Sequence, residues 1–193
     1  MAPKINPVHS FIKDAIRSGK IMIYPTDTLY GIGGNALDAN VVERIYSIKE
    51  RETGKPLSVI MGNLDMIKEY CELTKEQEII LLNFLPGPYT FILKLKKGKK
   101  LAAIGKSETV GVRVPEHQFA RRLSVELNVP IITTSANISG KKDTFTVKQI
   151  DKSVLNRVDV IVDTGETMHK QGSTVVNLIN MKLLRKGAGE WDK

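Results

Sequence analysis

Residues 173–186, STVVNLINMKLLRK, decide the class of the fold. The dipeptide Asn180-Met181 separates two runs that are rich in β-branched and apolar residues, Ser173 to Ile179 and Lys182 to Lys186. Two such runs joined by two residues are typical of a β-hairpin, in which the strands are antiparallel. We therefore predict a mixed sheet, with both parallel and antiparallel neighbours, rather than a purely parallel one.

Upstream of this hairpin, further short runs have the composition of strands and end at Gly, Pro, Asn or charged residues. They are Ile21 to Tyr24, Leu57 to Met61, Tyr89 to Leu95, Thr109 to Val114, Pro130 to Thr134 and Val158 to Val162. We predict a twisted sheet of about seven strands. The length is near that of one average domain, and no Ser/Gly-rich linker or internal repeat is present. Residues 1–193 are therefore expected to form a single α/β domain.

Three segments predict amphipathic helices that flank this sheet. Asn6-Pro7 has the cap and first-turn proline of a helix that ends at Gly19. Asn40 and Thr74 each stand three residues before a Glu or a Gln, which is the spacing of a capping box. In that motif each side chain binds the backbone N–H of the other residue, so we expect helices to begin at both positions.

The composition is that of an ordinary globular protein, with 41% apolar and 26% charged residues. The longest apolar runs, such as Ile79 to Leu82, are far shorter than the roughly 18 residues that a membrane-spanning helix requires. The N-terminus lacks the apolar segment and the cleavage site of a secretory signal. A cytoplasmic protein without a membrane partner is therefore expected.

Cysteine and histidine content argues against disulfides and metal sites. The single cysteine, Cys71, excludes an internal disulfide and a Cys-rich zinc site. The three histidines lie too far apart in the sequence to form a ligand motif, so no metal-binding residue is predicted. The net charge of +8 favours polyanionic partners such as nucleotides or nucleic acid. Part of this charge lies between Lys94 and Lys106, a stretch with six lysines and no acid.

Two glycine-rich stretches resemble nucleotide-binding motifs but have the wrong context. Gly31 to Ala36 matches G-x-G-x-x-A, the dinucleotide-binding fingerprint, yet it does not directly join a strand to a helix. Gly98 to Ser107 resembles a Walker A loop, but six residues separate its glycines where that loop has four. If the protein uses ATP, it must bind it by other means.

Five polar patches lie at the ends of predicted strands, where ligands of open α/β sheets collect. They are Tyr24 to Gly34 (YPTDTLYGIGG), Lys49 to Pro56 (KERETGKP), Thr109 to Pro115 (TVGVRVP), Thr133 to Gly140 (TTSANISG) and Gly172 to Val176 (GSTVV). Turn formation alone would account for any single patch. Together they hold hydroxyls, an amide and four cations, with no histidine base and no nucleophile elbow. This inventory suits the binding of a polyanion and a small zwitterion better than covalent catalysis.

The four cations allow more than one interpretation. Lys49, Arg51 and Lys55 are either solvated charges at the end of a helix or groups that approach a triphosphate, with Arg51 binding it in a bidentate manner. Arg113 lies between two valines of an apolar strand, where an unpaired guanidinium would be costly. It therefore needs an anion, which is either a protein carboxylate or a substrate carboxylate.

The ordered motifs YPTDTLYGIGG, K-x-R-x-x-x-K-P, PGPYTFIL, TVGVRVP, TSANISG and GSTVV cover nearly the whole chain and resemble those of the YrdC/Sua5 family. Members of that family include threonylcarbamoyl-AMP synthases. The resemblance implies a twisted α/β domain with a basic concave groove. It also implies a nucleotidyltransferase that converts L-threonine, bicarbonate and ATP into L-threonylcarbamoyladenylate and pyrophosphate. The product would feed N6-threonylcarbamoyl modification of the tRNA adenosine beside the anticodon, so the proteins that consume it are implied partners.

The resemblance also implies roles for individual residues by their motif position. Threonine would be held by Thr28, Arg113, Ser135 and Ser173, with Arg113 on its carboxylate. ATP would be bound by Arg51, Lys55, Thr109, Asn137 and Arg185, with Lys49 nearby. Lys49, Arg51 and Lys55 would supply positioning and charge stabilisation, because no catalytic nucleophile is implied. Mg²⁺ is expected on the triphosphate, with no protein ligand assigned to it.

Some features depart from the family pattern or leave alternatives open. Longer members often have Asn where Lys55 stands and His where Ile60 stands, and Ile60 cannot donate a hydrogen bond. The alternative function is an RNA-binding or translation-associated module of the same fold without synthase activity, suggested by the net charge and the lysine-rich stretch. Weak tRNA binding would fit either function. Aromatic residues form only 6% of the chain, which argues against a base-stacking platform. A carbamoyl transferase module is disfavoured because its zinc-binding cysteines are absent. Relatives of the YciO type are disfavoured by Lys49, Arg51 and Lys55 and by the intact Ser135-Ala136-Asn137.

Overall fold

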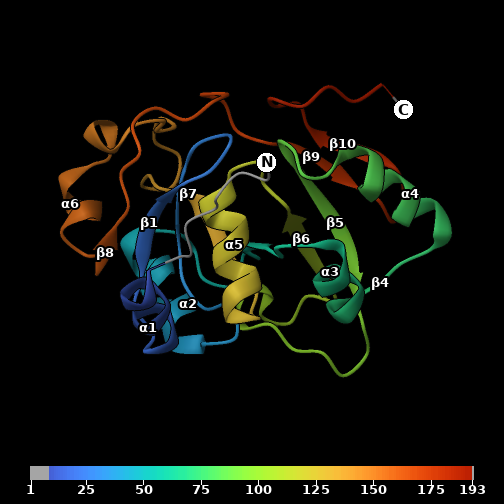
Figure 1. Ribbon diagram of the computed structural model, residues 1–193, viewed down its shortest axis with the longest axis horizontal. Helices are drawn as coiled ribbons and strands as arrows, with labels where there is room; N and C mark the ends of the chain where they lie inside the picture. The colour runs from blue at the N-terminus through green and yellow to red at the C-terminus, as the bar shows by residue number, and fades with distance from the viewer. Residues whose placement is uncertain (1–8, 193) are drawn as a thin grey trace, which may run out of the picture.

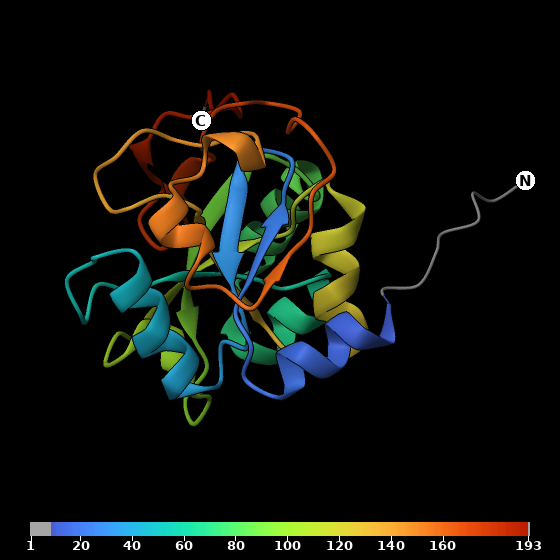
Figure 2. The same ribbon diagram turned by 90° about the vertical axis from the view of Figure 1, so that its left-hand side faces the viewer.

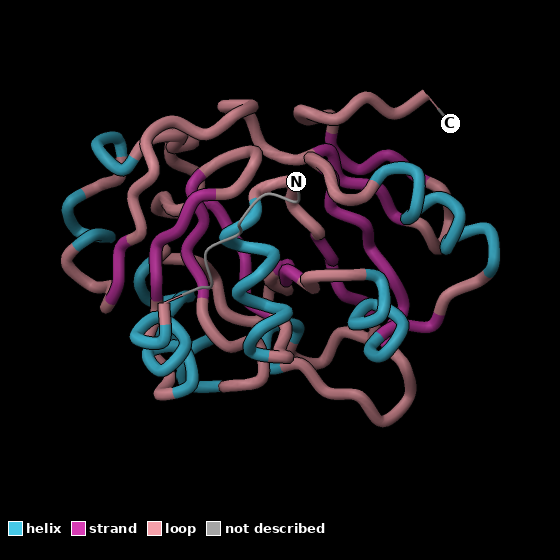
Figure 3. Tube along the Cα trace, in the orientation of Figure 1, coloured by secondary structure: helices cyan, strands magenta, loops and turns pink. Residues whose placement is uncertain are grey.

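The computed structural model describes residues 9–192, so the predicted helix cap at Asn6-Pro7 lies outside the described residues. One mixed sheet runs through the middle of the molecule, with helices around it (Figures 1 and 3). Its strands are β1 (Met22–Pro25), β2 (Tyr30–Gly33), β3 (Ser58–Ile60), β4 (Cys71–Glu72), β5 (Tyr89–Leu95), β6 (Thr109–Arg113), β7 (Ile131–Ser135), β8 (Val160–Ile161), β9 (Thr174–Asn177) and β10 (Lys182–Arg185). The α-helices are α1 (Ser10–Arg17), α2 (Ala39–Ile48), α3 (Leu64–Tyr70), α4 (Lys75–Phe84), α5 (Gln118–Leu127) and α6 (Lys152–Leu155), and short 3₁₀ turns occupy Ala102–Ile104 and Val147–Gln149.

The strand pairing confirms the predicted mixed α/β sheet. The strand order is β10-β9-β5-β6-β3-β7-β2-β1-β8, and β4 pairs with β5 beside this path. The pairs β5–β9, β3–β6 and β1–β8 are parallel, whereas β9–β10 and the central pairs β5–β6, β3–β7 and β2–β7 are antiparallel. The predicted antiparallel hairpin is therefore confirmed, but the two-residue turn expected at Asn180-Met181 was wrong. Lys182 pairs with Asn177, so the loop has four residues, 178–181. Met181, the last residue of this loop, has a left-handed φ of 56°.

The prediction of about seven strands was too low, because ten strands are present in residues 9–192. The main strand that was missed is β2, whose sequence Tyr-Gly-Ile-Gly has the composition of a loop. A Cβ atom on Gly33 would lie 1.8 Å from the carbonyl oxygen of Ile132, so this position of the sheet accepts only glycine. The Tyr24 ring lies against Gly31 and Gly33, and its hydroxyl donates to the same carbonyl at 2.7 Å. The glycines of the apparent dinucleotide fingerprint thus allow close packing within the sheet.

The helix starts were predicted with mixed success. Thr74 and Gln77 form the expected capping box at the start of α4. The prediction that Asn40 caps the next helix upstream was wrong, because the N-cap of α2 is Asp38. The Asp38 carboxylate accepts from the backbone of Asn40 and Val41, and a negative charge is favourable beside a helix N-terminus. The helix α1 begins at Ser10 and ends at Arg17, just before the glycine at which it was expected to stop.

Helices cover both faces of the β1–β2 pair. Figure 2 shows α1 and α5 on one side of this pair and α2 on the other. On the first side, Ile12 of α1 and Leu123 of α5 pack with Met22, Tyr24 and Ile131 of the sheet. The larger apolar cluster includes buried residues of α2, α3 and α4 together with Phe91 and Val112. Within residues 9–192, no helix combines the length and the apolar character needed to cross a membrane.

Candidate functional site

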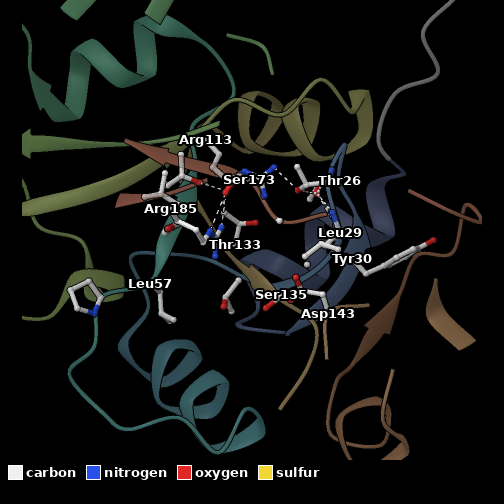
Figure 4. A pocket seen from close by; sticks show the side chains of 18 of the residues that line it. Thr26, Leu29, Tyr30, Leu57, Arg113, Thr133, Ser135, Asp143, Ser173 and Arg185 are labelled. Atoms are coloured by element: carbon white, nitrogen blue, oxygen red, sulfur yellow. Dashed lines mark hydrogen bonds between the residues drawn. The ribbon is translucent and has the colours of Figure 1, made fainter. Parts of the chain in front are cut away.

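Polar side chains from both halves of the sheet surround a cavity of about 250 Å³ (Figure 4). This volume is slightly below the ~300 Å³ at which typical small-molecule pockets begin, so it suits a small substrate. The predicted residues that line the cavity are Thr28, Arg51, Arg113, Ser135, Ser173 and Arg185. The predicted residues Lys49, Lys55, Thr109 and Asn137 are not part of this lining.

Arg113 is paired with a protein carboxylate at the end of β6. Its Nη2 atom donates to Oδ1 of Asp27 at 2.7 Å and to the hydroxyl of Thr28 at 2.8 Å. The Asp27 side chain is completely buried, and its other oxygen accepts from the backbone of Glu116 at 3.1 Å. Burial lowers the pKa of the Arg113 guanidinium, and the negative charge of Asp27 opposes this effect. The anion that the sequence required is therefore present within the protein.

The pairing with Asp27 leaves part of the guanidinium available. Arg113 Nε is buried and has no hydrogen-bond partner in the described part of the chain. An unsatisfied buried donor costs about 1–3 kcal/mol. Arg113 also lines the cavity beside Thr28. The geometry is thus compatible with an arginine that is oriented by Asp27 and completes its hydrogen bonds with a substrate.

The loop between β1 and β2 is a compact turn organised by the hydroxyl of Thr26. This hydroxyl accepts from the backbone of Thr28 and of Leu29, each at 3.2 Å, and donates to the Leu29 carbonyl at 2.7 Å. It also lies 3.0 Å from the hydroxyl of Thr28. Thr167, on a distant segment, donates to the Thr28 carbonyl at 2.7 Å. Thr28 is consequently held in a fixed position at the cavity wall.

Ser173 and Arg185 form the opposite wall. Arg185 donates to the Ser173 carbonyl through Nε at 3.1 Å and through Nη2 at 2.8 Å, and Nη2 also lies 3.2 Å from the Ser173 hydroxyl. The hydroxyl of Thr90 is 2.8 Å from the same hydroxyl. Gly187 and Ala188 then donate their backbone N–H groups to Thr174 Oγ1 and to the Gly172 carbonyl. The segment after β10 therefore holds the Gly172–Thr174 wall in place.

Lys49 lies at the end of α2 but is not a solvated charge there. Its side chain is almost fully buried. Its ammonium donates to the carbonyls of Ser135 and Asn137 and to Asn137 Oδ1, the last two at 2.7 and 3.2 Å. Asn137 Oδ1 also accepts from the Ser135 hydroxyl at 2.6 Å. Lys49 thus fixes the Ser135–Asn137 loop, and Asn137 supports Ser135 from behind the cavity wall.

The buried ammonium gives a prediction for pH dependence. Burial, together with the charge of Arg51, lowers the pKa of Lys49 from 10.5 to about 8, against the opposing charge of Asp143. Between these two pH values the unfolded chain holds a proton that the folded chain has released. The free energy of unfolding should therefore rise with pH in this window, by about 3 kcal/mol in total.

Urea denaturation of the wild type and of Lys49→Met at several pH values between 7 and about 11 measures this effect. The variant leaves the carbonyls of Ser135 and Asn137 without a donor, so it should be less stable at every pH. We expect the difference in free energy of unfolding between the wild type and the variant to increase as the pH rises from 8. Parallel curves would show that Lys49 keeps its proton through this range.

Arg51 and Lys55 differ in their surroundings. The Nη2 atom of Arg51 makes one long hydrogen bond, 3.4 Å to the Pro56 carbonyl, and its Nε atom is buried without a partner among residues 9–192. Lys55 does not line the cavity. Its ammonium pairs with the Glu52 carboxylate at 2.8 Å, and its side chain is 60% exposed. Arg51 is therefore positioned at the cavity, whereas Lys55 would reach a ligand only by leaving Glu52.

Three residues in or next to the cavity wall were not assigned by the sequence reasoning. Asp27, which lies behind the lining, orients Arg113. The sequence contained a clue to this role, because a buried arginine requires an acid and Asp27 lies in the first polar patch, Tyr24 to Gly34. Asp143 is the one carboxylate among the lining residues, and Thr90 bridges to Ser173. Neither shows a distinguishing local pattern, since both are placed by contacts with distant segments.

The lysine-rich stretch is partly engaged with neighbouring acids. Lys94 pairs with Glu72 at 2.9 Å, and Lys99 pairs with Glu69 at 2.7 Å. Lys96 donates to the carbonyl of Lys68. Three of the six lysines therefore have protein partners, and two of these partners are carboxylates that offset the positive charge. No residue of this stretch lines the polar cavity.

Comparisons with known proteins identify the family of this arrangement. Residues 14–187 match the Sua5/YciO/YrdC family model, which carries the description "Telomere recombination". A protein named "Putative threonylcarbamoyl-AMP synthase" from Methanocaldococcus jannaschii is 42% identical over 92% of this chain and 83% of its own length. Two solved structures are also similar.

The crystal structure of Pyrococcus abyssi Sua5 complexed with L-threonine has a TM-score of 0.85 and 34% identity. The match covers 92% of this chain and about half (53%) of the Sua5 chain. The crystal structure of Escherichia coli YciO has a TM-score of 0.82 and 29% identity over 96% of this chain and 93% of that chain. Because the family match covers most of its length, the chain belongs to the Sua5/YciO/YrdC family.

Proposed function

We propose that this protein is an L-threonylcarbamoyladenylate synthase, which forms its product from L-threonine, bicarbonate and ATP and releases pyrophosphate. The observation that carries the proposal is the 42% identity, over 92% of the chain, to a protein named as a threonylcarbamoyl-AMP synthase. The similarity to a Sua5 structure that is complexed with L-threonine supports threonine as a substrate. The polar cavity, with its arginines and hydroxyls, has the chemistry that these substrates need.

The proposed threonine subsite consists of Thr28, Arg113, Ser135 and Ser173. Arg113, which is oriented by Asp27 and lines the cavity, would bind the threonine carboxylate. The hydroxyls of Ser135 and Ser173 both lie in the cavity lining, where they would receive the remaining polar groups of the amino acid. The ATP subsite would comprise Arg51, Lys55, Thr109, Asn137 and Arg185, with Lys49 supporting it through the Ser135–Asn137 loop.

The chemistry requires positioning and charge neutralisation. The threonine amine and bicarbonate condense to a carbamate with loss of water. A carbamate oxygen then forms a bond to the α-phosphorus of ATP, and the bond from that phosphorus to pyrophosphate breaks. Both reactants are anions, so cationic groups lower the barrier by neutralising charge and by holding the reacting atoms together. Arg51 and Arg185, which line the cavity, are suited to this task.

The residues present fit a magnesium ion that arrives with the nucleotide. In residues 9–192 there is no cluster of three or more His, Cys, Asp or Glu side chains that could hold a metal. Mg²⁺ is commonly held by one or two carboxylates together with substrate phosphates, and Asp143 is the one carboxylate in the lining. We therefore propose that triphosphate oxygens hold the ion and that Asp143 faces it. Mg²⁺ would neutralise negative charge on the triphosphate.

The reaction makes a direct test possible. Pyrophosphate release from ATP by the purified protein should require L-threonine and bicarbonate together, because the nucleophile is assembled from both. A coupled pyrophosphate assay, with each substrate omitted in turn, measures this requirement. Omission of either should reduce release to the level without enzyme. Equal release in the absence of threonine would contradict the proposal and would favour a different ATP-dependent activity.

The wider context follows from the proposed reaction. The product is a reactive mixed anhydride, so we propose that it passes to tRNA-modification proteins that attach the threonylcarbamoyl group to adenosine, and that this takes place in the cytoplasm. Weak, salt-sensitive tRNA binding by the unpaired lysines of the Lys94–Lys106 stretch would be compatible with this use. The family match over residues 14–187 supports the proposal that residues 1–193 form a single YrdC-like domain.

A further inference from the structure

A second cavity, of about 300 Å³, lies between α3, α4 and α5 and shares no lining residue with the polar cavity. Figure 1 shows α3 between the other two helices. The lining residues are Gly62, Asn63, Leu64, Ile67, Leu81, Leu82, Leu85, Pro86, Val114 and Arg121. Seven of these ten are aliphatic or proline, and Arg121 is the one charged residue among them.

The mouth of this cavity is apolar. Leu82 on α4 lines it and is 64% exposed, and Ile79, one turn earlier on the same helix, is 59% exposed. Neighbouring residues of α4, Ile80 and Leu81, are buried in the core, so these two face outward instead. An apolar concave site with one or two polar groups is the usual form of a small-molecule pocket, and ~300 Å³ is at the small end of the usual range.

The polar end of the cavity is formed by Arg121 and Asn63. Among residues 9–192, no carboxylate lies within 4 Å of the Arg121 guanidinium, whereas the adjacent Arg122 pairs with Glu126 at 2.9 Å. Asn63 caps α3 through its Oδ1 atom, which accepts from Met66 at 2.8 Å, so its Nδ2 group remains as a donor.

Gly62 brings these two residues together. A Cβ atom at this position would lie 2.5 Å from the carbonyl oxygen of Arg121 and 2.4 Å from Val125 Cγ2. The absence of a side chain therefore allows α5 to approach the start of α3 closely. Arg121 and Asn63, which both line the cavity, therefore supply two hydrogen-bond donors to it, one of them charged.

We propose that this second cavity binds a small amphipathic carboxylate, with the carboxylate on Arg121 and Asn63 and the hydrocarbon body among Leu64, Ile67 and Leu85. A cationic ligand would be repelled by Arg121. A wholly apolar ligand would leave the guanidinium without an anion. A planar carboxylate matches the fork of an arginine, and the small volume suits a short hydrocarbon chain. This site is independent of the proposed synthase activity.

The test uses octanoate as the probe and octanamide, which has the same hydrocarbon body without charge, as the matched control ligand. Titration of the full chain should show saturable binding of octanoate with one site. Backbone amide shifts should change at Gly62, Asn63 and Arg121 and not at Ser173 or Gly31. Octanamide should bind about tenfold more weakly or worse, because charge-assisted hydrogen bonds are lost.

The protein side of the test compares Arg121→Gln with Arg17→Gln, which removes an exposed arginine of α1. Arg121→Gln should weaken octanoate binding about tenfold or more, Arg121→Lys should restore part of the affinity, and Arg17→Gln should leave it unchanged. Equal affinities for octanoate and octanamide would overturn the proposal, since they would show apolar partition alone. Amide shifts confined to the polar cavity, or no saturable binding, would also overturn it. The comparison of the two ligands holds even if Arg121→Gln fails to fold.

Discussion

Arg113→Ala is expected to abolish threonine binding and to lower the free energy of unfolding by about 3–5 kcal/mol. The second effect arises because the variant removes the ion pair between Arg113 Nη2 and Asp27 Oδ1, which are 2.7 Å apart. The Asp27 carboxylate then stays fully buried without a cation. The first effect arises because the carboxylate of threonine loses the guanidinium that we assign to it. Chemical denaturation gives the stability, and calorimetric titration with threonine and with ATP gives the two affinities.

The two effects can be separated with further variants. Arg113→Lys keeps a positive charge beside Asp27 but loses the forked donors, so it should remain folded and still bind threonine poorly. Asp27→Asn removes the charge of the partner while Arg113 stays, so threonine affinity should fall less than in Arg113→Ala. ATP affinity should change little in all three. Threonine binding that survives in a folded Arg113→Ala or Arg113→Lys variant would show that Arg113 serves the protein carboxylate alone.

Arg51→Ala should reduce ATP use roughly ten- to a hundredfold or more while threonine binding by the free protein persists. Arg51 makes one long hydrogen bond of 3.4 Å within the protein, so its loss should change stability little. Lys55→Ala should also reduce ATP use, and its exposed ion pair with Glu52 contributes little to the fold. Pyrophosphate release at varied ATP concentration, with threonine titrated separately, measures both expectations.

The matched control for these variants is Arg17→Gln, which removes a distant exposed charge and should leave both ligands unaffected. Circular dichroism and thermal melting establish that each variant is folded. If Arg51→Ala weakened threonine binding as strongly as ATP use, the two subsites would not be separate. Arg51 would then have to be assigned to the amino acid or to the shape of the whole cavity.

Local patterns predicted the elements whose structure depends on nearby residues. The strand Tyr89–Leu95 was predicted with its exact bounds, and the Thr74 capping box was also confirmed. The antiparallel pairing of the C-terminal hairpin was confirmed too, although its loop is longer than predicted. These features follow from β-branched composition and from turn and cap chemistry within a few residues. The mixed sheet could be predicted for the same reason, since a short hairpin fixes an antiparallel pair.

Features set by distant contacts could not be predicted in this way. The strand β2 has the composition of a loop because its glycines are required by the approach of Tyr24 and of the Ile132 carbonyl. Lys49 has the position of an ordinary charge at a helix end, but carbonyls 86 and 88 residues away surround its ammonium. Arg113 was correctly expected to need an anion, yet composition alone could not decide that Asp27 provides it.

The polar cavity has a consequence for how the protein acquires activity during synthesis. Its walls are joined by contacts between residues far apart in the chain, such as Asp27 with Arg113 and Thr90 with Ser173, which are 86 and 83 residues apart. Contacts of such high sequence separation require long loops to close before they form. Arg185 comes from the edge strand β10, after all the other residues assigned to the site have been translated. A nascent or truncated chain that ends before β10 therefore lacks the Arg185 side of the polar cavity. Ligand binding should consequently report on complete folding rather than on its early stages.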